Sequence, residues 1–187
     1  HLDLDEDGEV DTRIQIVQFT ESGRHGSDGK YLGSKPGFSI SITAINPQSK
    51  GEITVEGQNT KINPKYLSSK SDIELLKLAL KYCLQLLHSE PLSDHIHEIE
   101  EEYTMEQDPE KYIFNNIFSG AHLIGGTQNA INSRFEVDNT KGLYVCDASV
   151  FKEYAASNIH SSVVLISDIF AKKFVANNFG PSTKSEM

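Results

Sequence analysis

Apolar and polar residues alternate along short stretches in the first third of the chain. The stretch FSISITA at 38–44 places apolar side chains at every second position, which is typical of a half-buried strand. A second strand is predicted over 52–56 after a turn, with Ile53 and Val55 facing inward. A further strand-like run covers 12–20. Together these stretches predict an antiparallel β-sheet.

The pattern changes to helical spacing further along the chain. Ser71 and Glu74 match the Ser-x-x-Glu pattern of a capping box, which predicts the start of a helix that runs to His88. Apolar residues nearly encircle this helix, so we expect it to be buried on most sides, between a sheet and another layer. A shorter helix is predicted over 109–117. These elements predict an α+β fold, in which helices cover an antiparallel β-sheet.

The last third of the chain combines regular elements with side chains capable of chemistry. A strand is predicted over 142–146, and a long helix over 161–175, where apolar residues recur at helical spacing. A helix N-terminus that follows a strand and a loop favours an anionic or electron-rich ligand, because its free N–H groups and the helix dipole point at it. The polar residues at the joints of these elements are His122, Asp147, Asn158 and His160.

Each of these residues also has an ordinary structural interpretation. A single histidine beside glycines usually makes structural hydrogen bonds, so His122 alone does not indicate catalysis. Asp147 fits a turn at the end of a strand. Asn158 fits a cap of the helix that follows.

The order of motifs in this segment resembles the carboxyl-terminal end of the glucose–methanol–choline (GMC) oxidoreductases. These are FAD-dependent enzymes that oxidise alcohols and sugars. The motifs are His-x-x-Gly-Gly-Thr from His122, then Val-Asp, then Leu-Tyr-Val-Cys-Asp-Ala-Ser around Asp147, and Ser-Asn before an apolar helix. Asn158 follows Asp147 by 11 positions, which is the spacing that the family uses. The resemblance is strong over 121–175.

The resemblance implies a role for several residues. His122 would be the base that takes the proton of a substrate hydroxyl, and Asn158 would hold the substrate oxygen, with His160 as the alternative in that second position. Gly126 stands where the family usually has threonine, and Ile159 where proline is usual, which affects the expected loop geometry and substrate class. The implied cofactor-binding residues are Asp147, Ala148, Asn158, Ile159 and His160.

The resemblance also implies how the chain is divided. Residues 1–120 would form a substrate-binding sheet with helices. Residues 121–176 would form an active-site segment whose strand and helix complete an FAD-binding domain, followed by a tail at 177–187. The Gly-x-Gly-x-x-Gly turn that seats the FAD pyrophosphate does not occur in the sequence. We therefore expect a carboxyl-terminal fragment whose N-terminal FAD domain is missing.

Two classes of function follow from this interpretation. The first is an FAD-dependent oxidoreductase that acts on the CH–OH group of a small-molecule alcohol, sugar or sterol, with hydride transfer to flavin N5. In that case FAD belongs to the full-length protein and is not expected on this fragment, which alone would be inactive. The alternative is a non-catalytic α+β binding or interaction domain that keeps the family architecture.

Charge and cysteine content narrow the expected partners and compartment. The formal net charge is −10, from 17 basic and 27 acidic residues, which argues against nucleic acid or an anionic membrane as the main partner. The sequence has no apolar run long enough to span a bilayer. Cys83 and Cys146 lie in apolar contexts, which predicts free thiols and a reducing, cytoplasmic compartment.

An acidic stretch at the start of the chain partly matches a calcium-binding EF-hand loop. Its early acidic positions are Asp3, Asp5 and Asp7, but Ile14 stands where the loop requires a bidentate glutamate. We therefore expect an acidic turn before a strand.

A second acidic stretch, 93–110, includes His95 and His97. Histidines that alternate beside carboxylates can converge on one cation. No further ligand at a suitable spacing follows, so we expect a solvated acidic loop or lid and assign no metal site.

Overall fold

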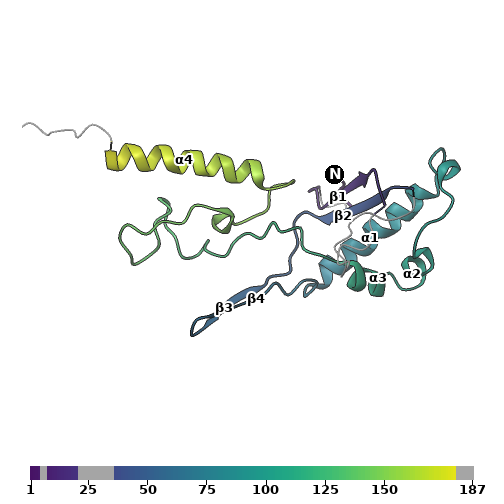
Figure 1. Ribbon diagram of the computed structural model, residues 1–187, viewed down its shortest axis with the longest axis horizontal. Helices are drawn as coiled ribbons and strands as arrows, with labels where there is room; N and C mark the ends of the chain where they lie inside the picture. Colours follow the sequence, from purple (N-terminus) through teal and green to yellow (C-terminus); the bar gives the residue numbers. More distant parts are fainter. Residues whose placement is uncertain (5–7, 21–35, 180–187) are drawn as a thin grey trace, which may run out of the picture. The chain divides into compact units, whose positions relative to one another are not determined.

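The computed structural model describes residues 1–4, 8–20 and 36–179. The chain forms two compact units, His1–Gly120 and Ala121–Met187, and each unit is described here by itself. Figure 1 shows the helices and strands of both.

The core of the first unit lies between a small sheet and a long helix. Strands β1 (Thr12–Val17) and β2 (Ser39–Ala44) pair antiparallel, with Ile14 opposite Ile42. Helix α1 (Lys70–Leu87) packs against β2 (Figure 1). The predicted α+β class, with antiparallel strands and a covering helix, is confirmed. The core cluster comprises Leu67, Leu80 and Ile113, with Ile42, Ile73, Leu76, Met105, Tyr112 and Ile117 packed against it.

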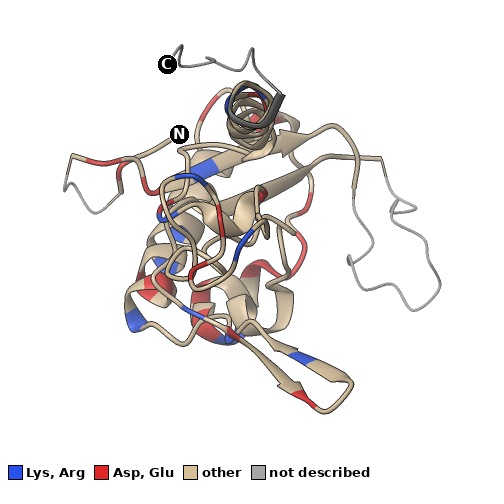
Figure 2. Ribbon diagram, turned by 90° about the vertical axis from the view of Figure 1, so that its left-hand side faces the viewer, with Lys and Arg blue, Asp and Glu red and all other residues tan. Residues whose placement is uncertain are grey.

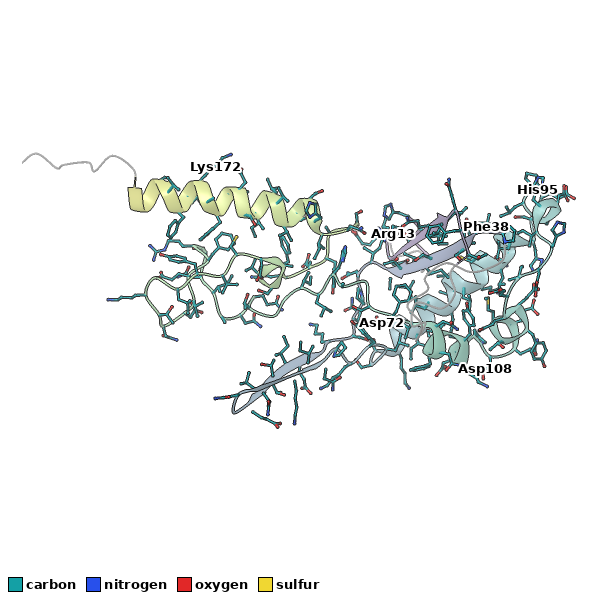
Figure 3. The ribbon with its side chains drawn as sticks, in the orientation of Figure 1. Arg13, Phe38, Asp72, His95, Asp108 and Lys172 are labelled. Atoms are coloured by element: carbon teal, nitrogen blue, oxygen red, sulfur yellow. The ribbon has the colours of Figure 1, made fainter. Side chains whose placement is uncertain are left out.

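The start of α1 differs from the predicted capping box. Ser69 is the N-cap residue and makes no side-chain cap hydrogen bond, and Ser71 already lies inside the helix. Asp72 in the first turn is buried and accepts hydrogen bonds from the backbone N–H groups of Gln48 (2.8 Å) and Ser49 (2.9 Å). Figure 3 labels Asp72 at this end of the helix. The helix start is therefore fixed by a carboxylate that holds a distant turn, and the capping-box prediction is wrong.

Helix α1 is also less buried than expected. Its buried residues include Ala79, Leu80, Cys83 and Leu84, which lie on one side. Leu78 and Tyr82, expected inside, keep 45% and 40% of their surface exposed. Helix α1 therefore packs against both β2 and α3 (Pro109–Asn116), as predicted, but keeps an exposed stripe that includes Leu78 and Tyr82.

Strand β3 (Glu52–Glu56) forms a hairpin with β4 (Asn59–Asn63), separate from the β1–β2 sheet. The prediction that 38–44 and 52–56 share one sheet is therefore wrong. The inward orientation predicted for Ile53 and Val55 is wrong too, since they are 63% and 69% exposed. The hairpin pairs only with itself in the described part of the chain, so nothing there covers its apolar face.

The acidic stretch 93–110 is partly regular. It contains a 3₁₀ turn, η1 (Ser93–His95), helix α2 (Glu102–Gln107) and the first residues of helix α3 (Pro109–Asn116). Helix α3 confirms the short helix predicted at 109–117. His95 and His97 are exposed. Figure 2 marks acidic positions red and basic positions blue.

In its described residues, the acidic turn at the start of the chain accepts hydrogen bonds from backbone N–H groups. Asp3 accepts a hydrogen bond from the Gly8 N–H (2.9 Å), and Asp11 accepts one from the Leu4 N–H (2.9 Å). Thr12 then bridges to Leu2 at the start of β1. This arrangement agrees with the expected acidic turn, although Asp5 and Asp7 lie outside the described residues.

The second unit contains a 3₁₀ turn, η2 (Ala148–Val150), and helix α4 (His160–Phe179). The predicted helix is confirmed, and it runs past 177, where a tail was expected. The strand predicted over 142–146 is wrong, because only Tyr144 forms a bridge there, an isolated one with Glu136. Residues 180–187 lie outside the described part. Across the described residues, neither α4 nor any other helix is long and apolar enough to cross a membrane.

Candidate active site

His122 lies at the start of a loop whose backbone conformation is unusual. Ala121 has φ of 56°, in the left-handed region that residues with a side chain seldom adopt. Gly125 has φ of 83°, and a Cβ there would lie 3.6 Å from the Phe151 carbonyl oxygen. Glycine is needed at this position because of the dihedral angle more than the available space. The His122 side chain is half-buried.

The loop after His122 is attached to the turn that contains Asp147 and Ala148. The Thr127 N–H donates to the Ser149 carbonyl (3.0 Å), and the two hydroxyl groups lie 2.7 Å apart. Asp147 is the N-cap of η2 and accepts hydrogen bonds from the Ser149 N–H (2.8 Å) and hydroxyl (2.5 Å). Because Ser149 has one hydroxyl proton and gives it to Asp147, Thr127 donates to Ser149. Asp147 therefore stabilises a turn, which is the structural role that the sequence analysis allowed for it.

Helix α4 begins where the sequence places its candidate ligand-binding residues. The Ile159 carbonyl accepts the first helical hydrogen bond, from the Val163 N–H (2.9 Å), so Ile159 is the N-cap position. Its side chain is only 9% exposed and anchors this end of the helix. Asn158 lies one residue earlier, directly before the N-cap position. Asn158 and His160 are both exposed.

A cluster of four aromatic rings holds α4 against the preceding loop. Phe135 meets Phe170 edge-on at 5.5 Å between ring centres, and Tyr144 meets Phe174 edge-on at 5.3 Å. Tyr144 also contacts Phe170 at 5.8 Å, and Phe170 and Phe174 lie 5.6 Å apart. Such pairs add about 0.5–1.5 kcal/mol each beyond the area they bury. They fix the helix that starts at His160.

Cys146 contacts the same helix. Its Sγ lies 3.7 Å from the Ile166 carbonyl oxygen. Burial and the nearby charge of Asp147 raise the pKa of the Cys146 thiol, against a hydrogen bond to Ser167 that lowers it. A raised pKa disfavours the thiolate, which is the nucleophilic form of cysteine.

The structure thus brings two of the predicted segments together. The loop that follows His122 contacts the turn at Asp147 and Ala148 through Thr127 and Ser149. The predicted approach of His122 to Asn158 or His160 stays a prediction. Thr127 and Ser149 were not singled out from the sequence, although both belong to the quoted motifs, because a hydrogen bond across 22 positions leaves no local pattern.

Solved structures share the fold of this chain. The chain is similar to pyridoxine 4-oxidase from Mesorbium loti, with 19% identity and a TM-score of 0.66, covering 79% of this chain and 32% of the other. It is also similar to a variant of the formate oxidase of Aspergillus oryzae RIB40, with 21% identity and a TM-score of 0.68, covering 75% and 27%. The fold is that of part of these oxidases.

The family model described as GMC oxidoreductase, which represents the carboxyl-terminal part, matches residues 47–167. The chain belongs to this family. Fatty acid photodecarboxylase of Chlamydomonas reinhardtii is 27% identical over 148 residues, 71% of this chain and 24% of that protein. Pyridoxine 4-oxidase of Microbacterium luteolum is 26% identical over 149 residues, 73% and 29%. The chain therefore spans about a quarter of the length of the curated relatives it matches.

Proposed function

We propose that this chain is the carboxyl-terminal part of an FAD-dependent oxidoreductase that oxidises a CH–OH group of a small-molecule alcohol, sugar or sterol. The observation that carries the proposal is the family match over 47–167, a range that contains His122, Asp147 and Asn158. The attachment of the His122 loop to the Asp147 turn supports it, since it joins two of these motifs within one unit.

His122 is the base in this proposal. Oxidation of an alcohol requires loss of the hydroxyl proton while a hydride leaves the same carbon, and an imidazole suits the proton step near neutral pH. The His122 ring accepts that proton, and the carbon–oxygen single bond becomes a carbonyl. The half-buried position and the constrained backbone at Ala121 and Gly125 support a fixed orientation of the ring.

Asn158 is the second group that the reaction needs. An amide that donates a hydrogen bond to the substrate oxygen fixes the direction in which the reacting carbon faces. His160 is the alternative for this role, because it lies two positions later and is also exposed. The buried Ile159 between them fixes the backbone from which both side chains extend.

The residues present fit part of an FAD site. FAD, when bound, accepts the hydride at its N5 position. The free N–H groups at the start of α4, at His160, suit an electron-rich ring edge on which negative charge develops. The turn at Asp147 and Ala148 would contact the phosphate and ribityl region. A pyrophosphate seat of the Gly-x-Gly-x-x-Gly type does not occur in the sequence, so these 187 residues alone should retain no stoichiometric flavin.

The missing partner would be the remainder of the protein, including its N-terminal FAD domain. Each unit leaves apolar side chains exposed that such a remainder would cover. On the hairpin they lie on one face, where Ile53 pairs with Ile62. An isolated hairpin is only marginally stable in water. These exposed apolar residues are Ile53, Val55 and Ile62 on the hairpin, and Val164, Leu165, Ile169 and Val175 on α4.

The two free cysteines agree with a reducing, cytoplasmic compartment, which is part of the proposal.

Anaerobic stopped-flow reduction of the flavin by alcohol in the full-length protein tests the residue roles. His122→Ala should leave flavin binding intact and slow reduction by about 10²–10⁴-fold, the usual contribution of general acid–base catalysis. Asn158→Ala should also slow it, and His160→Ala should do less. Near-normal reduction in His122→Ala, or the largest loss in His160→Ala, would overturn these assignments.

Flavin retention separates the enzyme from the non-catalytic alternative. The full-length protein should carry FAD through gel filtration, and the 187-residue chain should not. A full-length protein that binds no flavin would favour the interaction domain. Stoichiometric flavin on the 187-residue chain would show that the fragment interpretation is wrong.

A further inference from the structure

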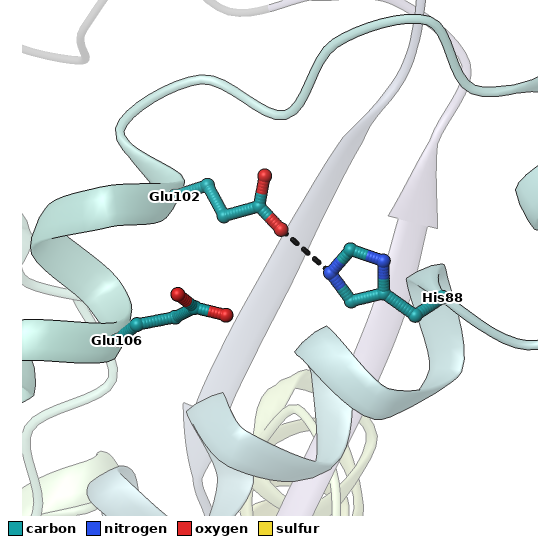
Figure 4. A group of neighbouring side chains, drawn as sticks. All are labelled: His88, Glu102 and Glu106. Atoms are coloured by element: carbon teal, nitrogen blue, oxygen red, sulfur yellow. Dashed lines mark hydrogen bonds and ion pairs between the residues drawn. The ribbon is translucent and has the colours of Figure 1, made fainter.

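Three side chains with metal-binding atoms meet at the end of α1. His88 is the C-cap residue of that helix, and Glu102 and Glu106 lie one turn apart on α2. The ring nitrogen of His88 and a carboxylate oxygen from each glutamate all lie within 4.8 Å of one another. Figure 4 shows both glutamates extending from α2 towards the imidazole, with His88 Nε2 2.5 Å from Glu102 Oε1.

The backbone holds these donors in place on both sides. The His88 N–H donates to the Leu84 carbonyl (3.1 Å), which keeps the histidine at the end of the helix. Met105 lies between the two glutamates in sequence and packs against the core cluster that includes Leu80. Because α1 supplies Leu80 and α2 supplies Met105, the core fixes the side of α2 that carries both carboxylates.

The charge around this group favours a cation. The set contains two carboxyl groups and one imidazole. In the described residues the Glu102 carboxylate pairs with His88, and no hydrogen bond or ion pair involves the Glu106 carboxylate.

We propose that His88, Glu102 and Glu106 bind one divalent transition-metal ion, for which Zn²⁺ is the best-suited probe. One imidazole nitrogen and two carboxylate oxygens are ligands that Zn²⁺ accepts, with water completing four-coordination. Zn–N and Zn–O bonds of about 2.0–2.2 Å place tetrahedral ligand atoms about 3.3 Å apart. His88 and Glu102 need to move apart slightly to reach that separation. His88 and Glu106 are exposed, so their side chains have room to adjust.

The bound ion would connect the end of α1 to α2. In the described residues that connection includes one exposed histidine–glutamate pair and packing by Met105. The proposed ion would therefore be structural, and its site is independent of the proposed oxidation. Calcium and magnesium prefer oxygen ligands only, so they should compete poorly for a site that contains an imidazole.

Titration of metal-free protein with Zn²⁺ against a chromophoric chelator tests the site. Wild-type protein should bind one equivalent with a Kd of about 1–10 μM, and saturating Zn²⁺ should raise its melting temperature. His88→Ala and Glu106→Gln should each weaken binding by about tenfold or more, since each removes one of three protein ligands. Glu106→Gln changes an exposed side chain and keeps the shape, so its fold should be preserved, as far-UV circular dichroism can verify.

Matched control variants lie in the same acidic segment. His95→Ala and His97→Ala remove exposed histidines outside the donor set, and Glu110→Gln removes an exposed carboxylate of α3. These variants should bind Zn²⁺ like the wild type. No saturable binding at 100 μM Zn²⁺, a concentration at least about tenfold above the expected Kd, would overturn the proposal. Binding that survives in His88→Ala and Glu106→Gln but is lost in the histidine controls would overturn it as well.

Discussion

Thr127 and Ser149 are joined by two hydrogen bonds, one between backbone groups at 3.0 Å and one between hydroxyl groups at 2.7 Å. Ser149 in turn donates to Asp147. This chain of contacts connects the loop after His122 to the turn before α4. The geometry of the candidate active site within the second unit therefore depends on two hydroxyl groups that are not themselves expected to react.

Ser149→Ala should lower the free energy of unfolding by about 1–3 kcal/mol, because it leaves the part-buried Thr127 hydroxyl and the Asp147 carboxylate each without one partner. Chemical denaturation with a probe in the second unit measures this. Ser133→Ala, at an exposed serine of the same unit, is the control and should change stability by less than about 0.5 kcal/mol. Equal effects of the two substitutions would contradict the connecting role of Ser149.

Asp72→Ala should destabilise the first unit by about 2–4 kcal/mol. The substitution removes the acceptor for the Gln48 and Ser49 N–H groups, and hydrogen bonds to a charged group contribute about 1.5–3 kcal/mol each. Glu74→Gln is the matched control two residues along α1. Glu74 makes an exposed ion pair with Lys77, which contributes at most about 1 kcal/mol. Urea denaturation of the wild type and the two variants should give the lowest free energy of unfolding for Asp72→Ala. A larger loss of stability in Glu74→Gln than in Asp72→Ala would contradict the role of Asp72.

Phe170→Ala should destabilise the second unit by about 2–4 kcal/mol, because Phe170 contacts three other rings of the aromatic cluster. Leu165→Ala, on the exposed side of the same helix, should cost less than about 0.5 kcal/mol in the 187-residue chain. In a longer protein that contains the proposed FAD domain, the cost at Leu165 should rise to about 1–3 kcal/mol if that domain covers it. Thermal unfolding of both lengths separates these cases, and an unchanged cost at Leu165 would argue against that coverage.

Cys83 should react with thiol reagents much more slowly than Cys146. Burial raises the pKa of Cys83 to about 11. At pH 8 its thiolate fraction is then about one thousandth, and it rises about tenfold with each pH unit until the pKa is reached. Cys146 also has a raised pKa but is less buried. Iodoacetamide labelling followed by peptide mass spectrometry measures both rates, and denaturant should abolish the difference. Faster labelling of Cys83 in native protein would contradict the burial of its thiol.

Much of the secondary structure follows from local sequence patterns. Period-two alternation over 38–44 predicts β2, and recurring apolar residues predict α1 and α4. In each case the signal arises because one face of the element packs against a core while the other meets water. The order and spacing of the motifs around His122, Asp147 and Asn158 indicate the GMC family before any fold is known, and the family match agrees.

The partners of these elements do not follow from local patterns. The capping box at Ser71 is not used, because the adjacent Asp72 bonds to a turn 23 and 24 positions away. Likewise β3 pairs with β4, its neighbour in sequence, and not with β2. A short loop at Gly57 joins β3 to β4, and closing a short loop costs little entropy.

The sequence by itself determined helices α1, α3 and α4, the positions of strands β1 and β2, and the family. The tertiary structure alone decided that Thr127 meets Ser149 and that His88 meets Glu102 and Glu106. These contacts join residues that are 14 to 22 positions apart. Periodicity reports only which face of an element is buried. Which side chains meet across such separations depends on how the elements pack, and that is set by the shape of the whole core.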